Sequence, residues 1–378
     1  MKKIKNIIIS CSFLAALLGV MVSGMIIPDN DISLSERRPL AQLPAFSWNA
    51  LVNKDKDGNR YFDNLEDYFL DQFVMRDGFR NLNTSTRRYL FMQKDIDNVF
   101  ILKDKIFMMD YKLNEDAVSK SADIYLKVIE RYFADKNANL YYTIVPDKNY
   151  YSASQNGYLS LDYDKMFSIM DDKLSDKFTF IDIRDELSED DYYRTDLHWK
   201  QTEIIDVANK LLNSMGNKSD ISIDDYEQVS FDDFKGSYFY RIPHNIEPDT
   251  LTYLTNDKLK NCKVFDFEKN AYVPMYADEK LGSVDTYDAF LWGPRSLMKI
   301  ENPEGNGKEL VIFRDSFGSS LAPLLVSDYS TVTIIDIRNT RINYRNIGRF
   351  VDFSENCDVL FMYNTGTLNV SDANSIIS

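Results

Sequence analysis

Strand-like apolar runs alternate with helix-like segments along most of this chain, and this alternation limits the possible folds more than any other feature. Strands are predicted for the runs at 139–145, 178–183, 309–313, 331–337 and 358–363. Apolar residues at helical spacing predict helices over 115–135, 161–175, 200–214, 317–326 and 343–352. Because strands connected through helices pair in parallel, the sequence predicts an α/β fold with a parallel sheet covered by helices.

The stretch 216–305 lacks this alternation. It contains short, aromatic-rich pieces broken by turns, so we interpret it as a strand-containing insertion. In parallel sheets the active site lies at the carboxyl ends of the strands. This rule directs attention to the loops that follow residues 145, 183, 313, 337 and 363.

The chain before the alternating region has a different character. Residues 29–60 are polar and dotted with prolines, which predicts an extended lead-in, and helical spacing then predicts two helices broken near Gly78. Two short strands are expected around Lys103–Asp104. The domains expected are therefore an anchor at 1–28, a lead-in with helices at 29–95 and a catalytic domain at 96–378.

The N-terminus predicts a contact with a membrane. Lys2, Lys3 and Lys5 precede 21 uncharged residues, Ile7 to Ile27. About 20 apolar residues span a bilayer, and flanking lysines stay on the cytoplasmic side. We therefore expect a single-pass anchor in the cell membrane with the rest of the chain outside the cytoplasm. A cleaved signal peptide and a secreted protein is the alternative.

Charge and composition exclude other classes. The formal net charge is −15, from 59 acidic and 44 basic residues, and no basic stripe is present, so we expect no nucleic-acid partner. Two histidines and three cysteines predict neither a metal site nor a cofactor bound through them. Cys262 and Cys357 are the cysteines of the exported part, and whether they pair is left open.

Three residues have the pattern of a nucleophile with its base. Ser316, in RDSFGSS, follows a predicted buried strand and begins a helix, where backbone N–H groups favour negative charge. His198 is the natural base for this serine, and Asp196 lies on the same side of an extended segment as His198. The alternatives are a serine that caps the helix and a histidine that only packs.

Several other residues are substrate-binding candidates. Arg338 and Arg76 could bind substrate oxygens or form salt bridges, and Trp199 could stack on a sugar or pack the loop. Asn364 and Asn339 are further substrate-binding candidates, and Asn364 follows a predicted strand. Lys148 lies just after a predicted strand, and the sequence favours neither a substrate-binding nor a structural role for it.

The motifs TDLHW and RDSF, more than a hundred residues apart, resemble the DHHW family, which is similar to the SGNH-hydrolase-like alginate O-acetyltransferases AlgJ and AlgX. Five further segments match that family in order: SERRPLAQLPAFS, LEDYFLDQFVMRD, VPDKNYY, FKGSYF and IDIRN. The resemblance implies an exported three-layer sandwich that moves acetyl groups onto polysaccharide hydroxyls, with Ser316 as nucleophile, His198 as base and Asp196 as its orienting group. It also implies a membrane-bound O-acyltransferase partner.

The sequence departs from the family pattern at two places. Leu197 replaces the first histidine of Asp-His-His-Trp, and Arg314 replaces the glycine that usually precedes Asp-Ser. An arginine there could crowd the nucleophile turn or bind an anionic group. Two alternatives to acetyl transfer stay open: a carbohydrate acetylesterase on the same fold, and a noncatalytic protein that binds or assembles glycans.

Overall fold

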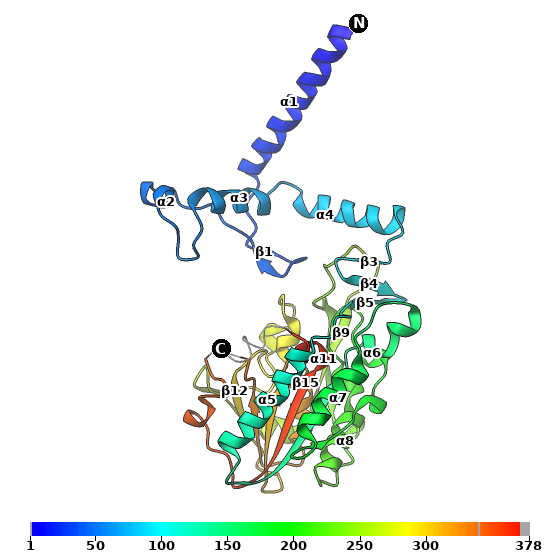
Figure 1. The fold of residues 1–378 in the computed structure, drawn as a ribbon, viewed down its shortest axis with the longest axis vertical. Helices are drawn as coiled ribbons and strands as arrows, with labels where there is room; N and C mark the ends of the chain where they lie inside the picture. Colours follow the sequence, from blue (N-terminus) through cyan, green and yellow to red (C-terminus); the bar gives the residue numbers. More distant parts are fainter. Residues whose placement is uncertain (1, 339–340, 371–378) are drawn as a thin grey trace. The chain divides into compact units, whose positions relative to one another are not determined.

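The computed structural model describes residues 2–338 and 341–370, and the chain forms two compact units (Figure 1). The first contains the residues up to 96 together with 240–245, and the second contains 97–239 and the residues from 246 onward.

The first unit is mainly helical. Its elements are α1 (Lys2–Ile26), the paired strands β1 (Ile32–Ser33) and β2 (Arg38–Pro39), α2 (Trp48–Val52), α3 (Tyr61–Asp71), α4 (Arg76–Ser85), a π-helical turn (Thr86–Leu90) and β3 (Asp95–Ile96). The two predicted helices are present as α3 and α4, but the predicted break near Gly78 is wrong. Gly78 lies inside α4, and the chain turns instead at Met75, whose φ is 60°.

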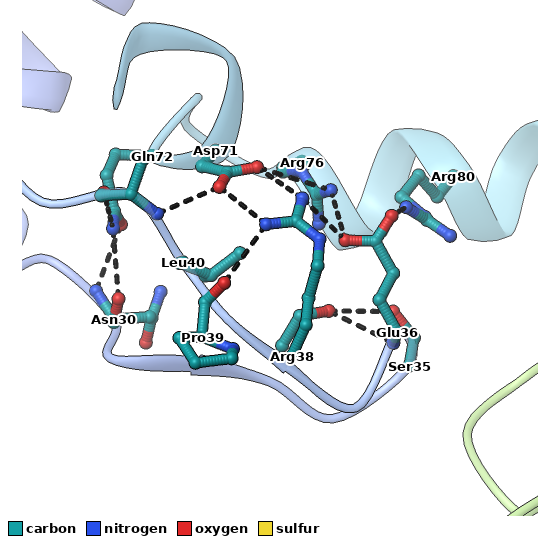
Figure 2. A network of polar contacts seen from close by, with 12 residues as sticks. Asn30, Ser35, Glu36, Arg38, Pro39, Leu40, Asp71, Gln72, Arg76 and Arg80 are labelled. Atoms are coloured by element: carbon teal, nitrogen blue, oxygen red, sulfur yellow. Dashed lines mark hydrogen bonds and ion pairs between the residues drawn. The ribbon is translucent and has the colours of Figure 1, made fainter. Parts of the chain in front are cut away.

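An ion-pair network joins α3 and α4 to the β1–β2 segment (Figure 2). The Arg38 guanidinium donates to both carboxylate oxygens of Asp71, at 2.7 and 2.6 Å, and its hydrogen bonds hold the pKa of Asp71 down at about 2. Arg76 donates to Glu36 at 2.7 Å, and Arg80 contacts the same carboxylate. The salt-bridge alternative for Arg76 is therefore confirmed, and the network holds Arg76 in the first unit.

The second unit is an α/β structure around an eight-stranded sheet of order β11-β10-β12-β14-β13-β15-β6-β7. Its strands are β6 (Asn137–Val145), β7 (Thr179–Phe180), β10 (Lys263–Asp266), β11 (Ala271–Val273), β12 (Leu297–Glu301), β13 (Glu309–Arg314), β14 (Thr331–Ile335) and β15 (Asn356–Asn364). Two hairpins lie outside this sheet: β4 (Val99–Leu102) with β5 (Lys105–Met108), and β8 (Glu227–Phe234) with β9 (Asp249–Thr255).

The sheet is mostly parallel, as predicted, but one of its edges is antiparallel. Strands β14, β13, β15, β6 and β7 are parallel, whereas β12, β10 and β11 add to β14 as antiparallel strands. These three strands come from the stretch that we interpreted as an insertion, so part of it belongs to the main sheet, while β8 and β9 form a separate hairpin. Antiparallel neighbours need only short connections, which explains why the one α-helix of this stretch is the short α9 (Asp257–Asn261).

Side chains of the central strands point alternately to two apolar layers. Leu310 and Ile312 pack with α8 (Ile205–Ser214) and α10 (Phe317–Leu325), while Val311 and Phe313 pack with α5 (Glu115–Tyr132) and α7 (Tyr163–Leu174). Helices therefore cover both faces of the sheet (Figure 1). All four of these β13 side chains are buried, and each contributes about 1.5–3 kcal/mol of transfer free energy. This two-sided core fixes the loops at the ends of the strands.

Two predicted elements are shorter than expected. The strand predicted over 178–183 is reduced to β7, and the helix predicted over 343–352 is only a 3-10 turn at Ile347–Arg349. There the side chain of Asn346 accepts from the backbone of Asn343 at 2.8 Å, and such local hydrogen bonds compete with a helix. The remaining short helices are α6 (Asn149–Ser152), α9 (Asp257–Asn261) and α11 (Thr365–Leu368).

The cysteines do not pair. Within the described residues Cys262 and Cys357 are free thiols, one half-buried and the other buried. Burial raises the pKa of both thiols, to about 11 for Cys262 and about 12 for Cys357, so neither is a reactive thiolate at neutral pH. The fold of the second unit therefore depends on its core and polar contacts, without a covalent cross-link in the described ranges.

Helix α1 is long and apolar enough, over Lys3–Gly24, to cross a membrane, and a signal sequence shares these properties. We predict that the native protein stays with the membrane fraction after a carbonate wash, because a spanning helix is not released when charges are screened. A variant that lacks residues 1–28 should become soluble. Mature native protein that begins near residues 25–30 in the soluble fraction would contradict the anchor.

Candidate active site

The carboxyl ends of β13 and β6, the parallel strands on either side of β15, bring the candidate residues together. Strand β13 leads directly into Ser316, the N-cap of α10, and β6 leads to Lys148. The loop with His198 is closed by an antiparallel bridge between Tyr192 and Trp199. The Tyr192 hydroxyl donates to the Pro146 carbonyl at 2.6 Å, which fastens this loop to the end of β6.

Ser316, His198 and Asp196 form a continuous hydrogen-bonded relay. The distance from His198 Nε2 to Ser316 Oγ is 2.7 Å, and that from His198 Nδ1 to Asp196 Oδ1 is 2.6 Å. An ionised carboxylate can only accept, so Nδ1 carries the proton and Nε2 accepts from the Ser316 hydroxyl. This is the tautomer that a base needs in order to take a proton from serine. The structure thus brings together the three residues that the sequence analysis assigned.

Asp196 is buried but well supplied with donors. Its Oδ1 also accepts from the His198 backbone N–H at 2.9 Å, and its Oδ2 accepts from the Ser237 N–H at 2.6 Å. Burial alone would raise the pKa of Asp196, but the electrostatic interaction with the His198 imidazole and these hydrogen bonds outweigh burial and hold the pKa below its usual range. Asp196 therefore stays ionised while it orients the imidazole.

A glycine lets the segment that carries Ser237 approach the Asp196 loop. A Cβ atom at Gly236 would collide with the Thr195 carbonyl and with the side chain of Asp196. The Gly236 N–H donates to Thr195 Oγ1 at 3.1 Å, and the Tyr238 N–H donates to the Thr195 carbonyl at 2.9 Å. The sequence analysis used this segment only as a motif match and missed its role as a support of the acid–base loop.

The imidazole of His198 is also held from its face. The Tyr287 ring stacks on it with 3.7 Å between centroids and 6° between planes. The Tyr287 hydroxyl and the Trp199 indole N–H both donate to Ser320 Oγ, at 2.8 and 2.9 Å. Trp199 is 0% exposed, so its prediction as a substrate-stacking residue is wrong: the indole packs the loop and has no face open to a sugar.

Lys148 is the most informative residue that the sequence left undecided. It is buried, and its ammonium donates to the backbone carbonyls of Asp196 at 2.8 Å and Tyr193 at 3.1 Å. Burial lowers the pKa of Lys148 to about 7, although the nearby carboxylates of Asp196 and Asp249 oppose this shift. Lys148 therefore fixes the backbone of the loop that carries the base.

The turn that carries the nucleophile is held by Asp315. One carboxylate oxygen of Asp315 accepts from the Phe317 N–H at 3.1 Å, and the other accepts from the Asn364 N–H at 2.7 Å. The side chain of Asn364 is itself engaged, because its amide donates to the Val145 carbonyl at 3.0 Å and its oxygen accepts from the Gly366 N–H. These contacts favour a structural role for Asn364 over substrate binding.

The other predicted binding residues have different outcomes. Arg338 forms a forked ion pair with Asp336, at 2.9 and 2.6 Å, which confirms the salt-bridge alternative. Asn339 lies outside the described residues. Within the described ranges, no three His, Cys, Asp or Glu side chains gather in a way that could hold a metal ion.

Arg314 does not crowd the nucleophile turn. Its side chain is 0% exposed and donates to the carbonyls of Asp315 and Gly293, each at 3.2 Å. Gly318 leaves room for it, since a Cβ atom there would lie 2.7 Å from Arg314 Cβ. Gly318, near the start of α10, therefore removes the steric conflict that an arginine at position 314 could cause.

Fold and site together define an α/β protein with a serine–histidine–aspartate relay at the carboxyl ends of parallel strands. A profile of the DHHW protein family matches residues 143–335, just over half of the 378 residues. The chain belongs to the DHHW family.

Solved structures share the fold at low sequence identity. A DHHW family protein from Eubacterium siraeum is similar with a TM-score of 0.60 and 20% identity, over 74% of this chain and 94% of that one. PatB1 of Bacillus cereus gives a TM-score of 0.57 and 16% identity, over 72% and 97%. The O-acetyltransferase domain of Pseudomonas putida AlgJ gives 0.46 and 12%, over 72% and 93%. The comparison with curated proteins gave no match.

The lowered pKa of Lys148 leads to a prediction about stability and pH. The pKa of Lys148 is about 7 in the folded chain, whereas that of an unperturbed lysine is 10.5, so between these pH values the unfolded chain binds a proton that the native chain lacks. Below about pH 7 the native protein carries the full free-energy cost of burying the charged Lys148 ammonium, and this cost falls as the pH rises. Stability relative to Lys148→Met should therefore increase from pH 7 to 10, by up to about 1.4 kcal/mol per pH unit.

Denaturant unfolding at several pH values measures this difference. The exposed Lys177 supplies the control, and Lys177→Met should show no such slope relative to the native protein. If the difference in the free energy of unfolding between the native and Lys148→Met proteins stays constant or falls over this pH range, the pKa of Lys148 is not lowered by burial.

Proposed function

We propose that the second unit is an SGNH-hydrolase-like enzyme that works outside the cytoplasm and moves acetyl groups onto hydroxyls of a cell-surface or secreted polysaccharide. The observation that carries this proposal is the relay with 2.7 and 2.6 Å between its three polar side chains. The choice of acetyl groups and of a polysaccharide rests on the motif resemblance described above. The fold similarity is consistent with it.

The relay accounts for the first half of the reaction. Ser316 Oγ attacks the carbonyl carbon of an acetyl ester while the serine proton moves to His198 Nε2. The attack forms a bond between Oγ and the acetyl carbon and leaves a tetrahedral oxyanion. The oxyanion collapses, the bond to the leaving alkoxide breaks, and His198 returns the proton to that alkoxide. The product of this half is acetyl-Ser316 and a free alcohol.

The second half reverses these roles. A sugar hydroxyl gives its proton to His198 Nε2 and attacks acetyl-Ser316, and collapse of the second tetrahedral oxyanion releases the acetylated sugar and restores the serine proton. Asp196 stabilises the imidazolium in both halves. The backbone N–H of Ser316, at the N-cap of α10, is the proposed donor to the oxyanion, because the first amides of a helix lack carbonyl partners in a preceding turn.

The proposal includes a supply of acetyl groups. An enzyme outside the cytoplasm needs a donor that is carried across the membrane, and the resemblance implies a membrane-bound O-acyltransferase as the partner. An anchor formed by α1 would keep the second unit near such a partner. If water replaces the sugar as acceptor, the same site is an acetylesterase. The intact relay disfavours a noncatalytic glycan-binding protein.

We predict that Ser316→Ala lowers the release of p-nitrophenol from its acetate by at least about a thousandfold, since removing a triad member commonly costs several orders of magnitude. Initial rates measured at equal protein concentration test this. The control is Ser175→Ala, at an exposed serine that ends α7, which should keep full activity. Undiminished turnover by a folded Ser316→Ala protein would refute the nucleophile.

A second prediction separates transfer from hydrolysis. A transferase must hold an acceptor hydroxyl near the acyl carbon, and such positioning lets a sugar compete with bulk water. With cell-wall or exopolysaccharide oligosaccharides present, acetylated sugar should appear by mass spectrometry while acetate release falls. Acetate release that stays constant across such a panel, with no sugar ester formed, would favour the acetylesterase.

A further inference from the structure

The peptide group between Asp315 and Ser316 is held from its carbonyl side. The Gly318 N–H donates to the Asp315 carbonyl at 3.1 Å, and the Arg314 guanidinium donates to the same oxygen at 3.2 Å. No cis peptide bond occurs in the described residues, so the Ser316 N–H points away from that carbonyl within one plane. Whatever fixes the carbonyl therefore also fixes the direction of the Ser316 N–H.

Arg314 is itself anchored on a strained turn. Its other terminal nitrogen donates to the Gly293 carbonyl at 3.2 Å. Gly293 follows Leu291 and Trp292, and these two side-chain-bearing residues have φ of 49° and 62°, in the left-handed region that such residues rarely occupy. Strained backbone of this kind persists only where surrounding contacts enforce it, and it is common near functional sites.

This arrangement is unfavourable for stability alone. The guanidinium of Arg314 is completely buried, and its Nε has no hydrogen-bond partner among the described residues. Burial lowers the pKa of Arg314, although the negative charge of Asp336 partly compensates. An apolar side chain of similar volume often costs no stability at such a site. Burial of the Arg314 guanidinium therefore costs free energy, and packing of the core does not require a charged side chain at this position.

We propose that Arg314 is a positioning residue, which clamps and polarises the Asp315–Ser316 peptide so that the Ser316 N–H faces the oxyanion of the acyl-transfer reaction. This inference rests on the proposed function. It also concerns a residue at which this chain departs from the usual glycine of the resembling motif.

Two physical effects support this role. A cation bonded to a peptide carbonyl draws electron density from the amide, and hydrogen-bond chains strengthen one another in this way. The clamp also fixes the donor before the reaction begins, so no reorganisation is needed as charge develops. Loss of one oxyanion donor costs about 10²–10³ in kcat. Loss of its clamp should cost less, about ten- to a hundredfold.

The test compares native protein, Arg314→Met, Arg314→Lys and the control Arg184→Met, with p-nitrophenyl acetate as substrate. Arg184 serves as the control because its guanidinium, like that of Arg314, donates two hydrogen bonds through separate nitrogens, in this case to Asp182 and away from the nucleophile turn. Arg314→Met should lower kcat about ten- to a hundredfold with KM within about twofold. Arg314→Lys keeps the positive charge but loses the two separate guanidinium donors, so its kcat should lie between those of the native protein and Arg314→Met. The control Arg184→Met should match the native protein.

A boronic acid inhibitor supplies the readout that a loosened fold would not move. Its adduct with serine is tetrahedral and anionic, so its inhibition constant should rise by the same factor by which kcat/KM falls, at an unchanged melting temperature. Native kcat in Arg314→Met while Ser316→Ala is inactive would overturn the clamp and leave the proposed function standing. A loss that lies in KM, or that follows a fall in melting temperature in both Arg314 variants, would also overturn it. A native protein as inactive as Ser316→Ala would overturn the proposed function instead.

Discussion

The hydrogen bond between His198 Nε2 and Ser316 Oγ is the interaction on which the account of this protein depends. It joins two loops whose residues are 118 positions apart in the sequence, at a distance of 2.7 Å. Neither side chain sets this distance by itself. The serine is fixed because β13 and α10 are buried on both sides of their junction, and the histidine is fixed because its loop is fastened to the end of β6.

Tyr192, Tyr193 and Trp199 anchor the loop with the base in the apolar core, and polar contacts fix the backbone between them. The side chain of Asp249 accepts from the N–H of Thr195 at 2.8 Å and from its hydroxyl at 2.6 Å. The Lys148 ammonium donates to carbonyls of this loop, and Gly236 lets the segment after β8 come within hydrogen-bonding distance of it. Buried charges of this kind give little net stability, but they select one geometry when each of their bonds is made.

Sequence patterns predicted the parallel strands, most of the helices and the relay, because burial period and strand-end position are local signals. They could not predict that β12, β10 and β11 extend the sheet, since antiparallel edge pairing depends on partners distant in sequence. The same reason applies to Lys148, Tyr287 and Asp249, whose roles exist only through long-range contacts. The sequence leaves both a binding and a structural role open for Arg76, Arg338 and Trp199, because it does not show which charged or aromatic groups find internal partners.

The most direct test of the central claim is to locate a covalent bond to the nucleophile. Treatment with an alkyl or aryl sulfonyl fluoride, followed by intact mass and peptide mass spectrometry, should show one added sulfonyl group on the peptide that contains Ser316. Labelling should be absent in Ser316→Ala and much slower in His198→Ala, because the hydroxyl then lacks its base. Labelling of another residue, or a rate in His198→Ala equal to that of the native protein, would contradict a serine activated by this histidine.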